Sequence, residues 1–166
     1  MVVVLAIISV IAIPHMTTGR TDAVASALSA SVSHVVMVLE VEHQKTDDGK
    51  WPSAIEPGWF NSRMIPKHPD QMAGVPAIQV VNTPGRKHPR EKIIVTNSPG
   101  AYWYNAAEGI FRARVKNLAS VSETLDFYNL VNQSDVGSLG TGGGAATPLE
   151  GGGLVSAGRD GGAALR

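Results

Sequence analysis

Histidines are the side chains of this sequence that most invite a metal-binding or catalytic interpretation. His68 lies two residues before Asp70, and His88 lies in a second segment that contains prolines. Both histidines follow a lysine, and a neighbouring cation disfavours the binding of a metal ion. His34 and His43 are nine residues apart, whereas a helical metal pair needs a spacing of four. We therefore expect histidines on surface loops and on the solvent side of a helix, not a catalytic centre.

Other patterns that could support chemistry are weak. A loose acidic group, Asp47, Asp48, Glu56 and Asp70, could bind calcium. Two glycine triplets near the C-terminus lack the strand–loop–helix context and the Lys-Ser/Thr pair of a phosphate-binding loop. GxSxG and HExxH motifs are absent, and the sequence contains no cysteine that could act as a nucleophile. We expect no enzyme and no cofactor, and a secreted hydrolase is disfavoured.

Composition divides the 166 residues into three segments. Residues 1–19 carry no Asp, Glu, Lys or Arg and suit a hydrophobic membrane or filament-core helix. Residues 20–132 hold all nine aromatic residues and suit a head domain that includes an amphipathic half of the same helix. Residues 133–166 are rich in glycine and suit a flexible, disordered tail. Because 14 basic and 14 acidic residues balance, nucleic acid is not an expected partner.

The apolar N-terminal run has three interpretations. Residues 1–13 contain twelve apolar residues and Ser9, which would make about 20 Å of helix, short of the ~30 Å hydrocarbon core. A signal peptide lacks its basic residues and a clear cleavage site here. A buried strand lacks flanking turn residues. We favour a membrane helix that has lost its first few residues.

Beyond Pro14 the pattern becomes that of an amphipathic helix. The apolar residues that fall on one helical stripe are Val24, Leu28, Val32, Val35 and Leu39. This spacing predicts one continuous helix over residues 2–46, with a kink or a locally melted stretch at Pro14. Gly49 then suits a left-handed turn.

The rest of the head is predicted to be a small sheet. Four segments, 77–81, 92–96, 101–104 and 110–115, are rich in β-branched and aromatic residues. We expect three or four antiparallel strands packed on the amphipathic half of the helix, which is an α+β fold. Strict alternation places Arg112 and Arg114 on one face of the last strand. A short closing helix follows, with Ser122 as its N-cap.

Two stretches together resemble the type IV pilin and type II secretion pseudopilin family. They are the N-terminal run MVVVLAIISVIAIP and the element Asp48-Gly49-Lys50-Trp51-Pro52. Residues 101–111 are also similar to the strand pair of pseudopilin heads. The resemblance covers residues 1–52 well, 53–132 loosely and the tail not at all. It implies a structural subunit of a type II secretion pseudopilus or a type IV pilus-like filament.

The start of the chain departs from this family. The resemblance implies a basic leader and a Phe-Thr-Leu-x-Glu stretch, the prepilin-type methylation segment, before the apolar run. We expect that Met1 is an internal methionine and that the gene start was placed too far downstream. A prepilin peptidase is then a partner only if the true start lies upstream. Major pseudopilins carry an acidic calcium loop near the C-terminus, and no such loop follows residue 115 here.

The resemblance also implies where the protein works and with what. Before assembly, the helix would cross the bacterial inner membrane once, in contact with lipid, with the head in the periplasm. Afterwards the subunit would lie in a filament of the cell envelope or outside the cell. Expected partners are copies of itself, other pseudopilins and an inner-membrane assembly platform. The residues expected to form the filament core are Val3, Leu5, Ile8, Ile11 and Pro14.

A second function stays open at this stage. The protein could be a membrane-anchored or exported binding module with no filament role, whose sheet recognises a ligand through Trp103 and its neighbours. A binding module has no need for a continuous helix of about 45 residues, whereas a pilin does.

Overall fold

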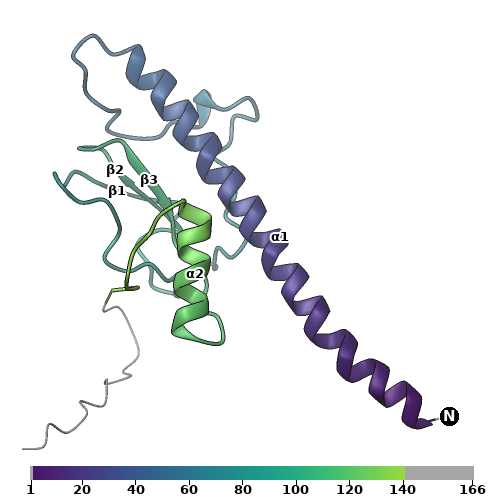
Figure 1. Cartoon of the computed structure of the whole chain (residues 1–166). Helices are drawn as coiled ribbons and strands as arrows, with labels where there is room; N and C mark the ends of the chain where they lie inside the picture. The colour runs from purple at the N-terminus through teal and green to yellow at the C-terminus, as the bar shows by residue number, and fades with distance from the viewer. Residues whose placement is uncertain (1, 141–166) are drawn as a thin grey trace, which may run out of the picture.

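The computed structural model describes the backbone of residues 2–140 and the side chains of residues 21–140. Its elements follow the order α1 (Val2–Gln44), a short 3-10 turn η1 (Pro57–Trp59), β1 (Ile78–Val81), β2 (Tyr102–Asn105), β3 (Ile110–Ala113) and α2 (Val121–Asn132). The predicted α+β class is confirmed (Figure 1). Most of the predicted glycine-rich tail, residues 141–166, lies outside the described residues.

Helix α1 dominates the molecule. It is one helix of 43 residues, about 65 Å long at 1.5 Å per residue. It continues through Pro14 without interruption, so the predicted locally melted stretch is wrong. A proline removes one hydrogen bond of a helix, and the remaining bonds of a long helix can keep the chain helical around it. Figure 1 shows the N-terminal half extending away from the head and the C-terminal half lying along it.

The C-terminal half of α1 packs on the head through a single stripe. Its buried residues are Ala25, Leu28, Val32, Val35 and Leu39. Ala25 takes the place that the sequence predicted for Val24, which is only partly buried. The stripe contacts β3 and α2 and belongs to one core with the aromatic residues of β2 and β3. Each fully buried leucine or valine stabilises this contact by about 1.5–3 kcal/mol.

The sheet is mixed, with the strand order β1-β2-β3. β2 and β3 pair antiparallel, as predicted, with Tyr104 opposite Phe111. β1 and β2 pair parallel, with Val80 opposite Tyr104, so the prediction of a wholly antiparallel sheet is wrong. The physical reason is the connection between them: residues 82–101 are long enough to return to the end of the sheet where β1 begins.

The predicted strand 92–96 is also wrong. Only Ile93 pairs there, in an isolated parallel bridge with Val115. A turn closes at once after it, because Ser98 N–H donates to the carbonyl of Val95 over 2.9 Å. The Ser98 hydroxyl oxygen in turn accepts the N–H of Val95 over 2.8 Å. These local bonds occupy the backbone groups that a longer strand would have needed.

Helix α2 closes the head against α1 and β3. Its N-cap is Ser120, whose hydroxyl oxygen accepts the N–H of Glu123 over 3.1 Å, so the predicted cap at Ser122 is wrong by two residues. Ser120 has the extended backbone that a cap requires, whereas Ser122 lies inside the helix. Near the other end, the Asn132 side chain accepts the N–H of Ala113 and donates to its carbonyl, over 2.7 and 3.0 Å. This pair of bonds fastens α2 to the end of β3.

Candidate functional site

The two halves of α1 form the candidate site, and we call them the projecting half (residues 2–20) and the docked half (residues 21–44). Among the described residues, Thr21–Gln44 is a helix long and apolar enough to cross a membrane by length and composition. The core helix of a soluble domain meets the same criterion, and the docked half does pack on the head. The feature that sets α1 apart is therefore its continuation beyond the head (Figure 1).

The five residues predicted for the filament core lie on the projecting half. Val3, Leu5, Ile8, Ile11 and Pro14 fall on helical backbone, and their side chains lie outside the described residues. At about 100° per residue, these five positions spread over about 200° of the helix circumference. A spread of this width suits a helix with several neighbours rather than one.

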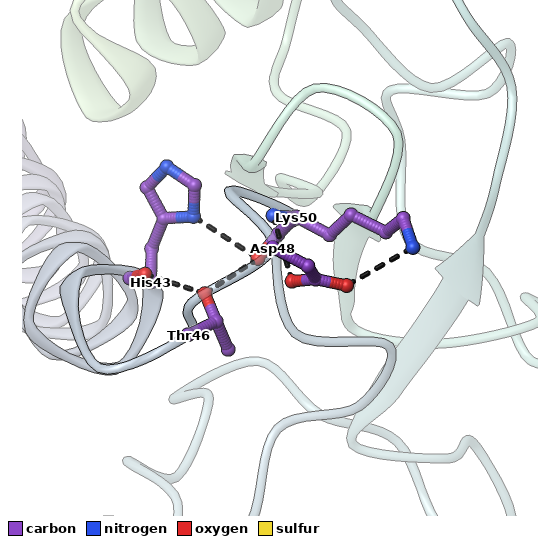
Figure 2. Close-up of polar contacts among 4 residues, drawn as sticks. All are labelled: His43, Thr46, Asp48 and Lys50. Carbon is purple, nitrogen blue, oxygen red and sulfur yellow. Dashed lines mark hydrogen bonds and ion pairs between the residues drawn. The ribbon is translucent and has the colours of Figure 1, made fainter.

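The far end of α1 is fixed by a compact turn (Figure 2). The Thr46 hydroxyl lies 2.5 Å from the carbonyl oxygen of His43 and 3.0 Å from that of Lys50. His43 Nδ1–H donates to the same Lys50 carbonyl over 3.0 Å. Asp48 accepts the Lys50 N–H and forms an ion pair with its ammonium group at 3.0 Å, and these contacts lower the pKa of Asp48. Because this pair is exposed, it organises the turn more than it stabilises the fold.

Trp51 joins this turn to the sheet. Its ring stacks on His43 with centroids 4.0 Å apart and planes 14° from parallel. Gly109 of the β2–β3 turn lies against the ring so closely that an added Cβ would collide with it. The Gly-Lys-Trp-Pro element that carried the resemblance thus anchors the end of α1 on the head. A groove of about 400 Å³ beside it includes Trp59 and Glu56 in its lining.

The predicted surface position of His68 is wrong. The side chain is fully buried, its Nε2–H donates to the carbonyl of Arg114 over 2.8 Å, and its Nδ1 accepts the N–H of Asp70 over 3.1 Å. Both ring nitrogens are thus used by the neutral form, and burial lowers the pKa of His68. The Lys-His-Pro-Asp segment is therefore a structural loop, in which the His68 ring satisfies the carbonyl of Arg114 and the N–H of Asp70.

His88 is half-buried rather than free on a surface loop. Its Nδ1 lies 3.1 Å from the hydroxyl of Tyr128. Burial, together with the positive charges of Arg112, Lys92 and Lys87, lowers the pKa of His88 to about 4. No hydrogen bond or ring contact joins His88 to His68, whose rings lie against Tyr128 and Tyr102 respectively. Within the part of the chain that the structure describes, no group of three or more His, Asp or Glu side chains could hold a metal ion.

The two histidines of the docked half differ from each other. His34 is exposed as predicted and touches the edge of Phe60, with ring centroids 5.7 Å apart. His43 is half-buried by its stack on Trp51, so its predicted solvent position is only partly right.

Sequence reasoning missed the role of Arg114. Its guanidinium group is 2% exposed and donates to the carbonyls of Glu91 and Gly100, over 2.9 and 2.6 Å, and to the side-chain oxygen of Gln79 over 2.5 Å. Burial lowers the pKa of Arg114. The alternation of the strand predicted only that Arg112 and Arg114 share a face. No local signal marks a buried arginine, because its acceptors come from three distant segments.

Trp103, the residue proposed to recognise a ligand, is almost completely buried. Its ring is 1% exposed. It lines a cavity of about 150 Å³ together with Arg86, Arg90 and Arg114, beneath the connection between β1 and β2.

Comparison with known proteins adds no assignment. The chain matches no family model, no curated protein and no solved structure.

Proposed function

We propose that the protein is a structural, non-enzymatic subunit of a filament of the type IV pilin kind, either a type II secretion pseudopilus or a pilus-like fibre. The observation that carries the proposal is the projecting half of α1, which continues the helix well beyond the head (Figure 1). From Val2 to Gly19 its sequence contains no Asp, Glu, Lys or Arg. Such a rod needs an apolar environment that the head does not supply.

Copies of the same helix can supply that environment, because the projecting half is apolar on all sides over residues 2–13 apart from Ser9. Identical helices packed side by side with an axial shift would cover one another. Because such contacts are heterologous and the axial shift prevents closure, they generate an open filament rather than a closed ring.

The membrane and the partners in this proposal are those that the resemblance to pilins and pseudopilins implies. Before assembly, the projecting half rests in the bacterial inner membrane with the head in the periplasm. An assembly platform in that membrane then delivers each subunit to copies of itself and to related pseudopilins. A prepilin peptidase acts on the protein if its synthesis starts upstream of Met1. The mechanism is mechanical and uses no cofactor.

A charge in the projecting half tests this function. We expect Ile8→Asp in the full chain to abolish filaments sheared from cells and seen by electron microscopy, because an unpaired carboxylate is costly in an apolar bundle. The matched control Ile8→Leu keeps the apolar surface and should retain filaments. Resistance of the head to trypsin should be the same in both variants. Filaments formed by Ile8→Asp, or none formed by the unaltered chain, would overturn the proposal.

A further inference from the structure

A groove with an acidic rim lies between the start of the docked half and α2. It has a volume of about 510 Å³ and an apolar lining that includes Leu118, Phe127 and Leu130. Leu130 is 61% exposed and contributes its side chain to this lining. The groove therefore offers an apolar surface to a partner.

Three carboxylates surround this apolar surface. Asp22 comes from α1, and Glu123 and Asp126 come from α2. Among residues 21–140, whose side chains the structure describes, no basic side chain lines the groove. Among the described residues, none of the three forms an ion pair. The groove thus combines an apolar lining with a net negative charge and suits a partner that carries cations around a small apolar group.

Such a segment exists on the same chain, in the connection between β1 and β2. Residues 83–90 contain Arg86, Lys87 and Arg90 and no acidic residue. Lys87 and Arg90 are exposed, and so is the ring of Pro84 at the tip of a turn. None of these three cations forms an ion pair with a described residue. The segment carries as many positive charges as the groove carries negative ones.

The basic segment is held in a fixed shape before any partner binds. The Asn105 side chain donates to the carbonyls of Thr83 and Arg86, over 2.7 and 2.8 Å, and accepts the N–H of Thr83 over 2.9 Å. Glu108 accepts the N–H of Gly85 over 2.7 Å. A loop fixed in this way loses little conformational entropy when it binds, which favours docking.

The groove and the basic segment meet different residues of α2: Asp126 and Leu130 line the groove, whereas the hydroxyl of Tyr128 lies 3.1 Å from Nδ1 of His88 in the segment. α1 and α2 pack on each other and on β3, whereas the basic segment follows β1 at the other edge of the sheet. Figure 1 shows the connection between β1 and β2 on the side of the sheet away from α1. His88 holds the segment on Tyr128 and Asn105 holds it beside β2, and none of the segment's residues lines the groove of its own head, so the occupant is a second copy.

We propose that the groove of one copy receives the Pro84–Arg90 segment of the next copy, with Pro84 against Leu130 and the exposed cations Lys87 and Arg90 facing the carboxylates. This contact rests on the proposed filament function and specifies how neighbouring heads meet. Because the two surfaces differ, each copy can accept one neighbour and offer its segment to another, and the chain of heads stays open at both ends. Its charged part should weaken as salt is added.

Cysteine crosslinking tests the contact directly, since the sequence contains no cysteine of its own. We introduce Leu130→Cys and Pro84→Cys together in the full chain, oxidise the cells mildly and separate the products by non-reducing electrophoresis. The proposal predicts a ladder of dimers, trimers and longer products. Leu130→Cys alone and Pro84→Cys alone should give monomers. Absence of the ladder, or dimers from either single variant, would overturn the contact.

Reversal of single charges provides a second test of the proposed contact. Asp126→Lys or Lys87→Glu, each added to the double-cysteine chain, should reduce the ladder about tenfold or more, because like charges then face each other. The combination of both reversals should restore it. Glu56→Lys, a matched reversal of an exposed residue outside the groove, should leave the ladder unchanged. Equal effects of Glu56→Lys and Asp126→Lys would overturn the proposed pairing.

The two proposals can fail separately. Filaments without the ladder would overturn the contact and leave the filament function intact. A ladder without filaments would support the contact and overturn the filament. Absence of both would overturn both.

Discussion

The projecting and docked halves of α1 belong to one helix and are both rich in aliphatic residues, yet they relate to the head in opposite ways. The docked half gathers its apolar residues in one stripe and places Asp22, Glu40 and Glu42 elsewhere on its surface. The projecting half is apolar on all sides over its first 13 residues. A stripe can be buried by the chain's own head, whereas a helix that is apolar all round requires other molecules.

The largest expected effect comes from the docked stripe. Leu28→Ala should lower the free energy of unfolding of the head by about 2–5 kcal/mol, because it leaves a cavity in the core. Ile11→Ala removes similar carbons from the projecting half and should leave the stability of the head unchanged. Urea unfolding in detergent, followed by tryptophan fluorescence, measures both. Equal losses would contradict the division of α1 into two halves.

A second prediction concerns the far end of the docked half. Gly109→Ala should cost about 2–4 kcal/mol, because Gly109 has φ +67° and its new Cβ would push Trp51 off His43. Gly137→Ala, at a position with open space around it, should change stability little. The fluorescence of Trp51 should shift in the first variant only. A neutral Gly109→Ala would show that Trp51 does not anchor α1.

Acid should lower the free energy of unfolding of the head by less than Leu28→Ala or Gly109→Ala does. The folded head holds His68 and His88 neutral with lowered pKa values, while the unfolded chain protonates them near pH 6.5. The unfolded state therefore binds more protons, and stability present above pH 6.5 falls as the pH drops towards 4. Urea midpoints at pH 7.5 and pH 5 measure the loss.

Substitution of single histidines shows which residue causes the pH dependence of stability. His68→Gln keeps a donor for the Arg114 carbonyl and should reduce the difference between the two midpoints. His34→Gln, at an exposed histidine, should preserve it. If both variants keep the full difference, the buried imidazole of His68 is not its source.

The smallest effect tests the cap of the helix that packs on the docked half. Ser120→Ala should cost about 1 kcal/mol, because the N–H of Glu123 loses its acceptor. Ser122→Ala, inside the first turn of α2, should be close to neutral. A larger loss of thermal stability in Ser122→Ala than in Ser120→Ala would show that Ser122 is the cap, as the sequence predicted.

Local patterns in the sequence predicted the elements that depend on neighbouring residues. The continuous helix, the apolar stripe through Leu28 and Val35, and the β2–β3 hairpin all follow from spacing. The parallel pairing of β1 depends on a connection of about 20 residues whose path no periodicity records. The burial of His68 and Arg114 depends on carbonyls from distant segments.

The candidate site was predicted unevenly for the same reason. The sequence predicted the apolar run of the projecting half, because the absence of charged residues there can be recognised without knowing any tertiary contact. The acidic groove is not, since Asp22 and Asp126 lie about 100 residues apart and meet only when α2 packs on α1.

That packing also sets an order in time. Gln133, at the end of α2, donates to Ser33 of the docked half across 100 residues of sequence. At the usual 5–20 residues per second, a ribosome needs about 5–20 s to make the chain between them. Throughout that interval the apolar stripe of α1 has already been synthesised, whereas α2, which packs on it, is not yet complete. A membrane or a chaperone that binds early meets both halves of α1 uncovered, and only the later arrival of α2 releases the docked half to the head.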